Sequence, residues 1–362
     1  LLESGKYERP AGSIESVKHG ADLIVKAKKP LLWGGGGVIS GKASGEFTAL
    51  AEYLQAPVIT TGEGRGSISD RSYLSIGSFR FKNDKFFENR IDDYDLIVAV
   101  GTRMAYPGFL KGQKILQIDI DEEEIGRNYE NTDGIVGDAK KSLSSLLNAL
   151  KDRIPARESR EAELNALKEE RFNPATVIEP QNSYVQAIRR AMPDDGIFVS
   201  GMTQIGYYSR NKYEVYEPGT YLTSSYYGNL GFAYPTALGA KVAKPDKAVV
   251  AVSGDGGFMF NVQELSTAVR HKINAVALVF NDNAFGNVMR DQVNMYEGRE
   301  YGARVHNPDF MKLADAFGVR GVRIRDGSPD ELEKELNDSL QIDSPTLIEV
   351  PVGEMPNPFR DY

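Results

Sequence analysis

Two acidic residues, each flanked by glycine or asparagine, are the residues of this sequence best suited to chemistry. Asp255 stands within residues 254–257 (GDGG), and Asp282 stands within residues 281–283 (NDN), with 24 residues between the two motifs. Carboxylates are ligands that a hard cation such as Mg²⁺ prefers, and glycines let the backbone approach a phosphate group closely. Either motif alone is more often an ordinary turn, so the prediction rests on their combination.

Both motifs follow apolar runs that are typical of buried parallel strands. Residues 247–252 and 273–280 are the two runs, and residues 260–272 between them have helical spacing. A right-handed strand–helix–strand crossover brings the carboxyl ends of its two strands to the same edge of a sheet, where such proteins bind ligands. We therefore expect Asp255 and Asp282 to converge.

The same alternation of strand and helix patterns extends over most of the chain and predicts an α/β protein with two doubly wound parallel sheets. We expect a linker remnant at 1–11, a central α/β domain at 12–150, a charged linker at 151–181 and a second domain at 182–362. The linker prediction rests on 12 charged residues among the 21 of segment 151–171. Leucine at position 1 suggests the back part of a longer chain.

Composition excludes several classes of function. Lys and Arg number 43 and Asp and Glu 51, and the net charge of -8 disfavours nucleic acid and anionic membrane surfaces as partners. No apolar run approaches the roughly 20 residues of a membrane-spanning helix, so we expect a cytoplasmic protein with no membrane partner. The chain has no cysteine and only 3 histidines, which disfavours thiolate chemistry and multi-histidine metal sites.

The two acidic motifs together resemble the signature of thiamine diphosphate-dependent enzymes, which begins Gly-Asp-Gly and ends Asn-Asn. In that family the aspartate, the second asparagine and a backbone carbonyl two residues further hold Mg²⁺ on the diphosphate. The resemblance implies Asp255, Asp282 and Ala284 as metal ligands. Asp282 replaces asparagine, which keeps an oxygen ligand but adds a negative charge. The further cofactor-binding residues implied here are Gly254, Gly256, Gly257 and Phe285.

Residues 227–240 are similar to a segment of acetolactate-synthase-like enzymes in which a large apolar residue holds the cofactor in a bent shape. The resemblance implies Leu230 as that residue, with the Gly228 carbonyl and the Leu230 amide bonded to the aminopyrimidine ring. A weaker match at 199–204 implies that Met202 and Thr203 lie at the diphosphate, near a helix N-terminus. The alternatives are a glycine-rich loop with Leu230 in the core, and an ordinary strand-to-helix loop.

The resemblance covers residues 12–150 and 180–362 and implies thiamine diphosphate- and Mg²⁺-dependent decarboxylation or carboligation of 2-oxo acids by a homo-oligomer. The family's amino-terminal pyrimidine-binding domain, which supplies an activating glutamate, has no counterpart here. The chain would therefore supply the diphosphate-binding half of a site and be inactive alone. One alternative is a nucleotide-dependent oxidoreductase of two doubly wound domains. Another is a non-catalytic binding partner that retains the fold.

The first domain and the substrate pocket add narrower expectations. In acetolactate synthases the central domain binds FAD, but the glycine runs 34–37 and 62–66 lack dinucleotide-binding spacing, so we favour tight turns over an FAD site. Asp291 stands where typical acetolactate synthases have a tryptophan that shapes the second keto acid's pocket, which argues against an ordinary branched-chain biosynthetic enzyme. Phe285 and Met289 are candidates for lining that pocket, with plain packing an equal alternative.

Overall fold

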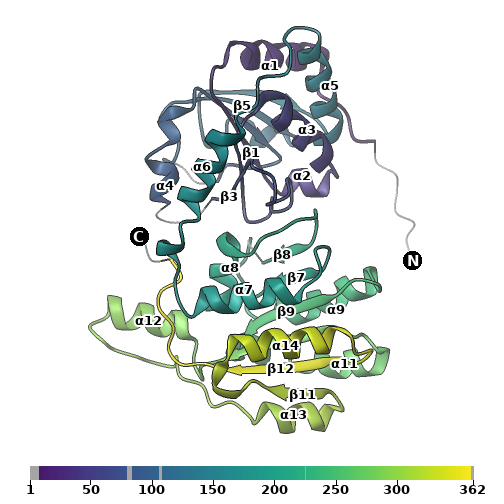
Figure 1. Ribbon diagram of the computed structural model, residues 1–362, viewed down its shortest axis with the longest axis vertical. Helices are drawn as coiled ribbons and strands as arrows, with labels where there is room; N and C mark the ends of the chain where they lie inside the picture. Colours follow the sequence, from purple (N-terminus) through teal and green to yellow (C-terminus); the bar gives the residue numbers. More distant parts are fainter. Residues whose placement is uncertain (1–7, 80–83, 106–107, 225, 360–362) are drawn as a thin grey trace. The chain divides into compact units, whose positions relative to one another are not determined.

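The computed structural model describes residues 8–79, 84–105, 108–224 and 226–359, so most of the predicted linker remnant lies outside the described residues. The chain divides into two compact units, one of residues 1–173 with 216–218 and one of residues 174–215 with 219–362. Each unit contains a six-stranded parallel sheet with helices around it (Figure 1). The predicted fold class, α/β with two doubly wound parallel sheets, is confirmed.

The sheet of the first unit has the strand order β3-β2-β1-β4-β5-β6. Leu32 of β1 lies opposite Val58 of β2 on one side and Val98 of β4 on the other, in parallel register. The order changes direction beside β1, which is the doubly wound arrangement. Its strands are β1 (Pro30–Gly34), β2 (Val58–Thr60), β3 (Ser75–Ser78), β4 (Leu96–Val100), β5 (Lys114–Asp119) and β6 (Thr132–Val136).

Helices cover both faces of this sheet. Leu32 packs with α1, α3 and α5, whereas its neighbours Leu31 and Trp33 pack on the opposite face with Phe87 of α4. Successive residues of a strand point to opposite faces, so a strand covered on both sides must be apolar throughout. The helices are α1 (Ile14–Lys26), α2 (Gly36–Ser40), α3 (Ser44–Leu54), α4 (Lys85–Glu88), α5 (Ala139–Lys151) and α6 (Glu161–Arg171), with 3-10 turns at Ile91–Asp93 and Glu122–Glu124.

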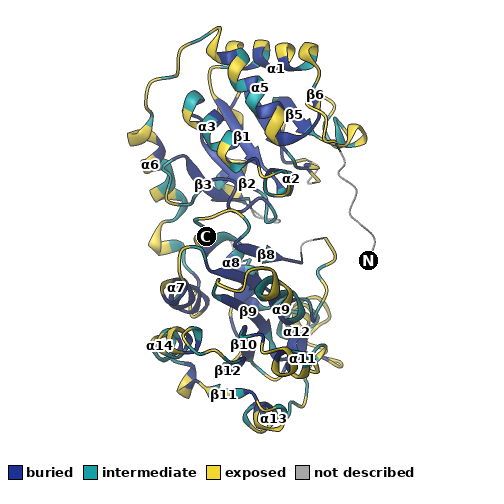
Figure 2. Ribbon diagram, turned by 90° about the vertical axis from the view of Figure 1, so that its right-hand side faces the viewer, coloured by how far each residue is buried: buried dark blue, intermediate teal, exposed yellow. Residues whose placement is uncertain are grey.

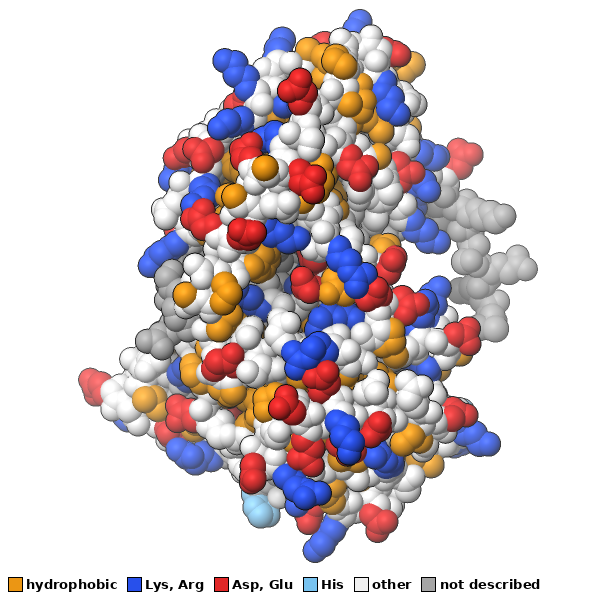
Figure 3. Space-filling model, viewed as in Figure 1, with side chains coloured by type: hydrophobic (Ala, Val, Ile, Leu, Met, Phe, Trp, Pro, Cys, Tyr) orange, Lys and Arg blue, Asp and Glu red, His pale blue; other side chains and the backbone are white. Residues whose placement is uncertain are grey.

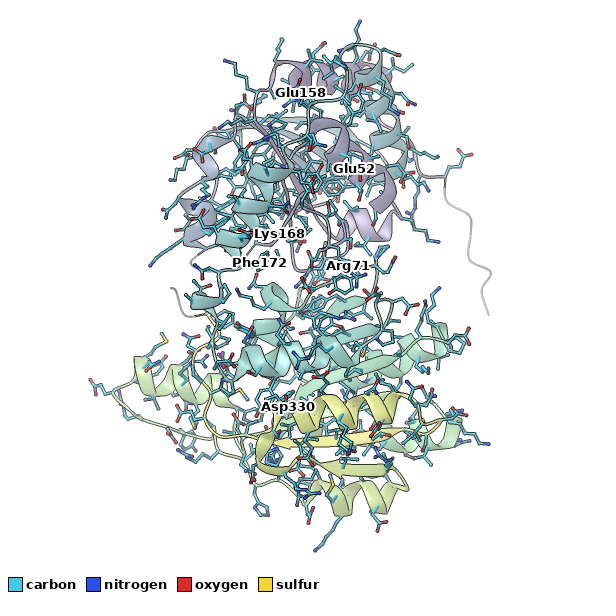
Figure 4. All side chains as sticks on the ribbon, viewed as in Figure 1. Glu52, Arg71, Glu158, Lys168, Phe172 and Asp330 are labelled. Carbon is cyan, nitrogen blue, oxygen red and sulfur yellow. The ribbon has the colours of Figure 1, made fainter. Side chains whose placement is uncertain are left out.

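The charge-rich segment 151–171 contains a helix that is attached to the first unit. Helix α6 buries Leu164, which is 1% exposed. Lys168, labelled in Figure 4, donates from Nζ to the carbonyl oxygens of Asp70 (2.5 Å) and Ser72 (2.9 Å). Charged side chains of this segment therefore hold α6 in place through specific partners, in addition to solvating its outer face.

The sheet of the second unit has the order β11-β12-β10-β9-β7-β8, again with every pair parallel. Strands β9 and β10 are neighbours in the middle, as the predicted strand–helix–strand unit requires. The strands are β7 (Ile197–Ser200), β8 (Tyr221–Thr223), β9 (Val249–Gly254), β10 (Val276–Asn281), β11 (Arg320–Arg323) and β12 (Thr346–Pro351).

Two apolar layers enclose this second sheet. Val250, Val252 and Leu278 pack with α7, α8 and α14 on one face, and Ala251 and Val279 pack with α9, α11 and α13 on the other. Figure 2 shows the resulting pattern of buried strands and helices with exposed outer faces. The helices are α7 (Gln181–Ala191), α8 (Gln204–Lys212), α9 (Ala233–Ala243), α10 (Asp255–Met259), α11 (Glu264–His271), α12 (Gly286–Met295), α13 (Phe310–Phe317) and α14 (Pro329–Leu340), with 3-10 turns at Pro174–Thr176 and Arg325–Gly327.

The outer surface carries charges of both signs. Acidic and basic side chains are interspersed over the face drawn in Figure 3. In the part of the chain that the structure describes, no helix is both long enough and apolar enough to cross a bilayer.

A buried ion pair at the end of α6 predicts a measurable loss of stability. Arg171 donates from Nη1 and Nη2 to the two carboxylate oxygens of Asp84 at 2.7 and 2.8 Å, and the side chains are 6% and 0% exposed. Arg171→Met removes both hydrogen bonds from a buried carboxylate, so we expect the free energy of unfolding to fall by about 3 kcal/mol. Urea unfolding followed by circular dichroism measures the change.

Lys111→Met is the matched control within the same unit. The Lys111–Asp92 pair is exposed at both ends, at 55% and 62%, and such a pair contributes at most about 1 kcal/mol. If Arg171→Met shifts the unfolding midpoint no more than Lys111→Met does, the buried pair does not stabilise the unit.

Candidate functional site

The candidate site lies at the carboxyl edge of the second sheet, where β7, β9 and β10 end. The strand order changes direction between β7 and β9, and open parallel sheets bind ligands at such a point. The predicted residues follow these strands directly: Met202 and Thr203 come after β7, residues 254–257 end β9 and begin α10, and residues 282–285 come after β10. A Cβ on Gly254 would lie 3.3 Å from Oγ1 of Thr203, so the ends of β7 and β9 are in contact.

One cleft of about 620 Å³, including its open mouth, collects almost all of the predicted residues. Gly228 does not line it, but a Cβ on Gly228 would lie 3.2 Å from Cε of Met202, which does. Met289 is not at the cleft; it packs with Ala284 and Ala303, which supports the packing alternative. The predicted residues that line the cleft are Met202, Thr203, Leu230, Gly254, Asp255, Gly256, Gly257, Asp282, Ala284 and Phe285.

The side chains of Asp255 and Asp282 meet in the cleft. Asp255 is 1% exposed and Asp282 is partly buried, and the two carboxyl groups are within hydrogen-bonding contact. Burial, and then the negative charge of Asp255, raise the pKa of Asp282 to about 7. Burial also raises the pKa of Asp255, against the opposing effect of a hydrogen bond from Asn307. Two carboxyl groups in this position favour either a shared proton or a bound cation.

Asn307 is a site residue that the sequence analysis missed. Its Nδ2 donates to Oδ2 of Asp255 (2.5 Å), to Oδ1 of Asn281 (3.0 Å) and to Oδ1 of Asn283 (3.2 Å). The segment that carries it runs beside the second motif, where the amide of Phe285 donates to the carbonyl of Ala303 (2.7 Å). No periodic pattern marks this irregular segment, so the sequence held no signal for Asn307.

The helix predicted at 260–272 is wrong in its limits. Helix α10 already begins at Asp255, ends at Met259, and is separated by a turn from α11 at Glu264–His271. The physical reason lies in Asn261, whose Nδ2 donates to the carbonyl of Gly231 (2.8 Å). This bond ties the turn between the helices to the loop that carries Leu230. As a result, Asp255 occupies the first turn of a helix.

Two glycines are required where the backbone approaches these side chains. A Cβ on Gly256 would lie 2.5 Å from the ring of Phe285, and a Cβ on Gly286 would lie 2.5 Å from Oδ2 of Asp282. Asn283 between the strand end and α12 has φ 55°, a left-handed conformation that asparagine tolerates. The sharp turn brings the amide of Ala284 to Oδ1 of Asp282 (3.1 Å).

The donor set suits a hard cation that takes further ligands from a phosphate group. The Asp255 and Asp282 carboxylates provide two ligands, and the carbonyl of Ala284, which accepts no hydrogen bond within the described residues, can provide a third. Among the residues that the structure describes, no group of three or more His, Cys, Asp or Glu side chains could hold a metal ion. A metal in this cleft would therefore need ligands from elsewhere, such as phosphate oxygens and water.

The glycine run 34–37 of the first unit closes a tight turn. The amide of Gly35 donates to the carbonyl of Val100, and that of Gly37 to the carbonyl of Gly101, both at 2.9 Å. Cβ atoms at Gly35 and Gly37 would lie only 2.2 and 2.5 Å from backbone atoms of Gly101. Close packing between two strand ends accounts for these glycines. The expectation about FAD stays a prediction.

Comparison with known proteins finds two family matches that together span most of the chain. Residues 201–350 match the family described as thiamine pyrophosphate enzyme, C-terminal TPP binding domain. Residues 17–146 match the family described as thiamine pyrophosphate enzyme, central domain. The first match contains the residues that line the cleft except Val352 and Met355, and the second covers most of the first unit.

Curated relatives are similar along nearly the full length of this chain. A probable acetolactate synthase large subunit of Methanococcus aeolicus is 32% identical over 93% of this chain and 60% of its own length. An acetolactate synthase large subunit of Haemophilus influenzae is 30% identical over 90% and 59%, and a sulfoacetaldehyde acetyltransferase of Castellaniella defragrans is 28% identical over 98% and 65%. The chain thus spans roughly three fifths of the length of these relatives.

The contact between the two carboxyl groups predicts a pH-dependent stability in the metal-free protein. The pKa of Asp282 is about 7 in the folded chain and about 3.9 when unfolded, so ionising Asp282 opposes folding. The contribution of Asp282 to the free energy of unfolding is therefore largest below about pH 4, and it is lost as the pH rises towards 7. Asp282→Asn cannot ionise, and we expect it to be more stable than the parent by roughly 1–2 kcal/mol at pH 8. Urea unfolding at pH 5 and pH 8 with a chelator present measures this.

Asp246→Asn serves as the control, because Asp246 is an exposed loop residue. Its pH profile should run parallel to that of the parent chain. If the profile of Asp282→Asn is also parallel to the parent's between pH 5 and pH 8, repulsion within the buried carboxyl pair is negligible.

Proposed function

Because the chain belongs to the thiamine pyrophosphate-dependent enzymes, among their acetolactate-synthase-like members, we propose that it supplies the diphosphate- and Mg²⁺-binding half of a site that decarboxylates or joins 2-oxo acids. The contact between the Asp255 and Asp282 carboxyl groups carries the proposal. A divalent cation would balance both charges and hold an anionic group at the same place.

Each ligand proposed for Mg²⁺ has support in its surroundings. The pKa of Asp282 is raised by burial and by Asp255, so a cation there would stabilise the ionised form. Nδ2 of Asn307 donates to the Asp255 carboxylate, and the amide of Ala284 donates to the Asp282 carboxylate. These two bonds fix the positions of the proposed ligands. Together with the Ala284 carbonyl, the two carboxylates form a partial coordination shell, which suits Mg²⁺ because it retains water and phosphate ligands.

The residues proposed to hold thiamine diphosphate surround this shell. Met202 and Thr203 precede the first turn of α8, whose amide groups favour anionic oxygens. Gly257 lies against Leu230, since a Cβ there would come within 3.7 Å of Cδ2. Leu230 is proposed to hold the cofactor bent, and Gly228 and Leu230 to bind the aminopyrimidine through their backbone. Gly254, Gly256 and Phe285 are proposed to line the diphosphate side of the cleft.

The residues of this chain would bind and orient the cofactor and the substrate, and they would exclude water. The cofactor would supply an electron sink for the electron pair released when the bond to CO₂ breaks. No glutamate of this chain is assigned the role of activating the aminopyrimidine. On this proposal the chain alone binds cofactor without turnover, and the activating residue comes from another domain. The donor and acceptor acids stay unassigned, and Asp291 in place of tryptophan argues for a reaction other than ordinary acetolactate synthesis.

We further propose a homo-oligomer that assembles through the second unit in the cytoplasm. Tyr226 and Tyr227, on the loop that leads to Leu230, are 68% and 93% exposed, which is unusual for aromatic side chains beside a site. No feature of the described residues favours the nucleotide-dependent oxidoreductase. A binding partner that retains the fold without catalysing would be recognised by cofactor binding without turnover of any 2-oxo acid in the full-length protein.

Asp255→Ala tests the proposed metal site. We expect it to weaken Mg²⁺-dependent binding of thiamine diphosphate by at least about 100-fold, because it removes one of the two carboxylates proposed as metal ligands. Isothermal titration calorimetry of the full-length protein with and without Mg²⁺ measures the affinity.

The exposed Asp246→Ala is the matched control and should bind thiamine diphosphate as the parent does. Unchanged affinity in Asp255→Ala, or binding by the parent that is indifferent to Mg²⁺, would rule out the assignment of the metal ligands.

A further inference from the structure

A polar wall of the cleft, made of Gln204, Asn287 and Arg290, lies outside the predicted site residues. Gln204 begins α8, Asn287 lies in the first turn of α12, and both line the cleft. Arg290 stands behind them on α12: Nη1 donates to Oε1 of Gln204 (3.1 Å), and Nη2 donates to Oδ1 of Asn287. Tyr207, nearly one turn along α8, lines the same side of the cleft.

The guanidinium determines the direction of both amide groups. A guanidinium carries five N–H donors and no acceptor, so Gln204 and Asn287 must turn their oxygens towards it and their nitrogens away. Within the described residues, neither amide nitrogen donates a hydrogen bond. Two amide NH₂ groups are therefore available to a ligand in the cleft.

The charge of Arg290 is not balanced by a nearby carboxylate. In the described part of the chain, none lies within ion-pair distance of its guanidinium, and its Nε is buried with no hydrogen-bond partner. Burial lowers the pKa of Arg290, and the charges of Asp291, Tyr207 and Glu354 oppose this effect. A partly buried cation of this kind is unfavourable unless a ligand supplies the anion.

We propose that Gln204 and Asn287, backed by the positive charge of Arg290, bind the carboxylate of the 2-oxo acid substrate. A carboxylate offers two acceptor oxygens and one negative charge, which match two NH₂ donors and one cation. The inference rests on the proposed function, since it concerns the substrate of that same site. Gln204 and Asn287 are the contacting residues, and Arg290 is a positioning residue that acts through them.

A diphosphate offers similar acceptor oxygens, so the effect of each variant on the binding of oxamate and of thiamine diphosphate must distinguish the two ligands. The ionisable groups that act on the charge of Arg290 are Asp291, Tyr207 and Glu354, and the Asp255–Asp282 pair is not among them. The amide end of the wall nevertheless adjoins the proposed metal ligands, because a Cβ on Gly286 would lie 2.5 Å from Oδ2 of Asp282 and 3.8 Å from Nε2 of Gln204.

Binding of an unreactive substrate analogue tests the wall without depending on turnover. The probe is oxamate, an isostere of pyruvate that keeps the carboxylate, compared with oxamide, in which a neutral carboxamide replaces it. For the full-length protein loaded with thiamine diphosphate and Mg²⁺, we expect Arg290→Met to weaken oxamate binding about 10- to 100-fold, the range for hydrogen bonds to charged groups. Binding of oxamide and of thiamine diphosphate should change less than about twofold.

Three further variants keep the test decisive. Arg290→Lys retains the positive charge and should restore part of the affinity for oxamate. Gln204→Glu keeps the side-chain shape but pairs with Arg290, so it should weaken oxamate binding even if Arg290→Met does not fold. Arg299→Met is the control, because the side chain of Arg299 is 74% exposed and its ion-pair partner Glu297 is 88% exposed.

The outcomes separate this inference from the proposed function. If Arg290→Met weakens the binding of thiamine diphosphate instead of the binding of oxamate, the wall binds the diphosphate and the inference is overturned. Equal losses for oxamate and oxamide, or for Arg290→Met and Arg299→Met, overturn it too. If oxamate binding by the parent depends on Arg290 but the parent converts no 2-oxo acid, the wall binds a carboxylate as inferred, and the proposed reaction is wrong.

Discussion

The contact between the carboxyl groups of Asp255 and Asp282 is the constraint on which the rest of the second unit depends. A buried and a partly buried carboxylate in contact repel each other when both are ionised, so the surrounding structure must hold them together. Strands β9 and β10 do this by pairing in register up to Gly254 and Phe280. Apolar layers on both faces prevent the strands from shifting, because a packed core resists small displacements.

The polar surroundings of that contact complete what the strands begin. Asn307 donates to Asp255 and to both asparagines that flank Asp282, so one amide links three segments of the site. Glycine at 256 and 286 leaves the space that a methyl group would fill. A group of residues that is unfavourable without a ligand, yet supported from several sides, is typical of a binding site.

The convergence of the two acidic residues could be predicted from the sequence because it depends only on local patterns and on a general rule of handedness. Continuous apolar runs identify buried parallel strands, and the crossover rule then places their ends at one edge. The break between α10 and α11 could not be predicted, since it depends on the bond from Asn261 to Gly231, 30 residues away. The roles of Asn307 and Lys168 depend in the same way on partners remote in sequence.

The charge distribution connects the site to the composition of the whole chain. A protein with net charge -8 offers no general attraction to an anionic cofactor or an anionic acid. Each anion would therefore need its own local source of positive potential. On the proposed function, Mg²⁺ held by Asp255 and Asp282 serves the diphosphate, and the amides in front of Arg290 serve the substrate. The two sources are neighbours, because the helix that carries Asn287 and Arg290 begins four residues after Asp282, so on these proposals the two anions would bind side by side in one cleft.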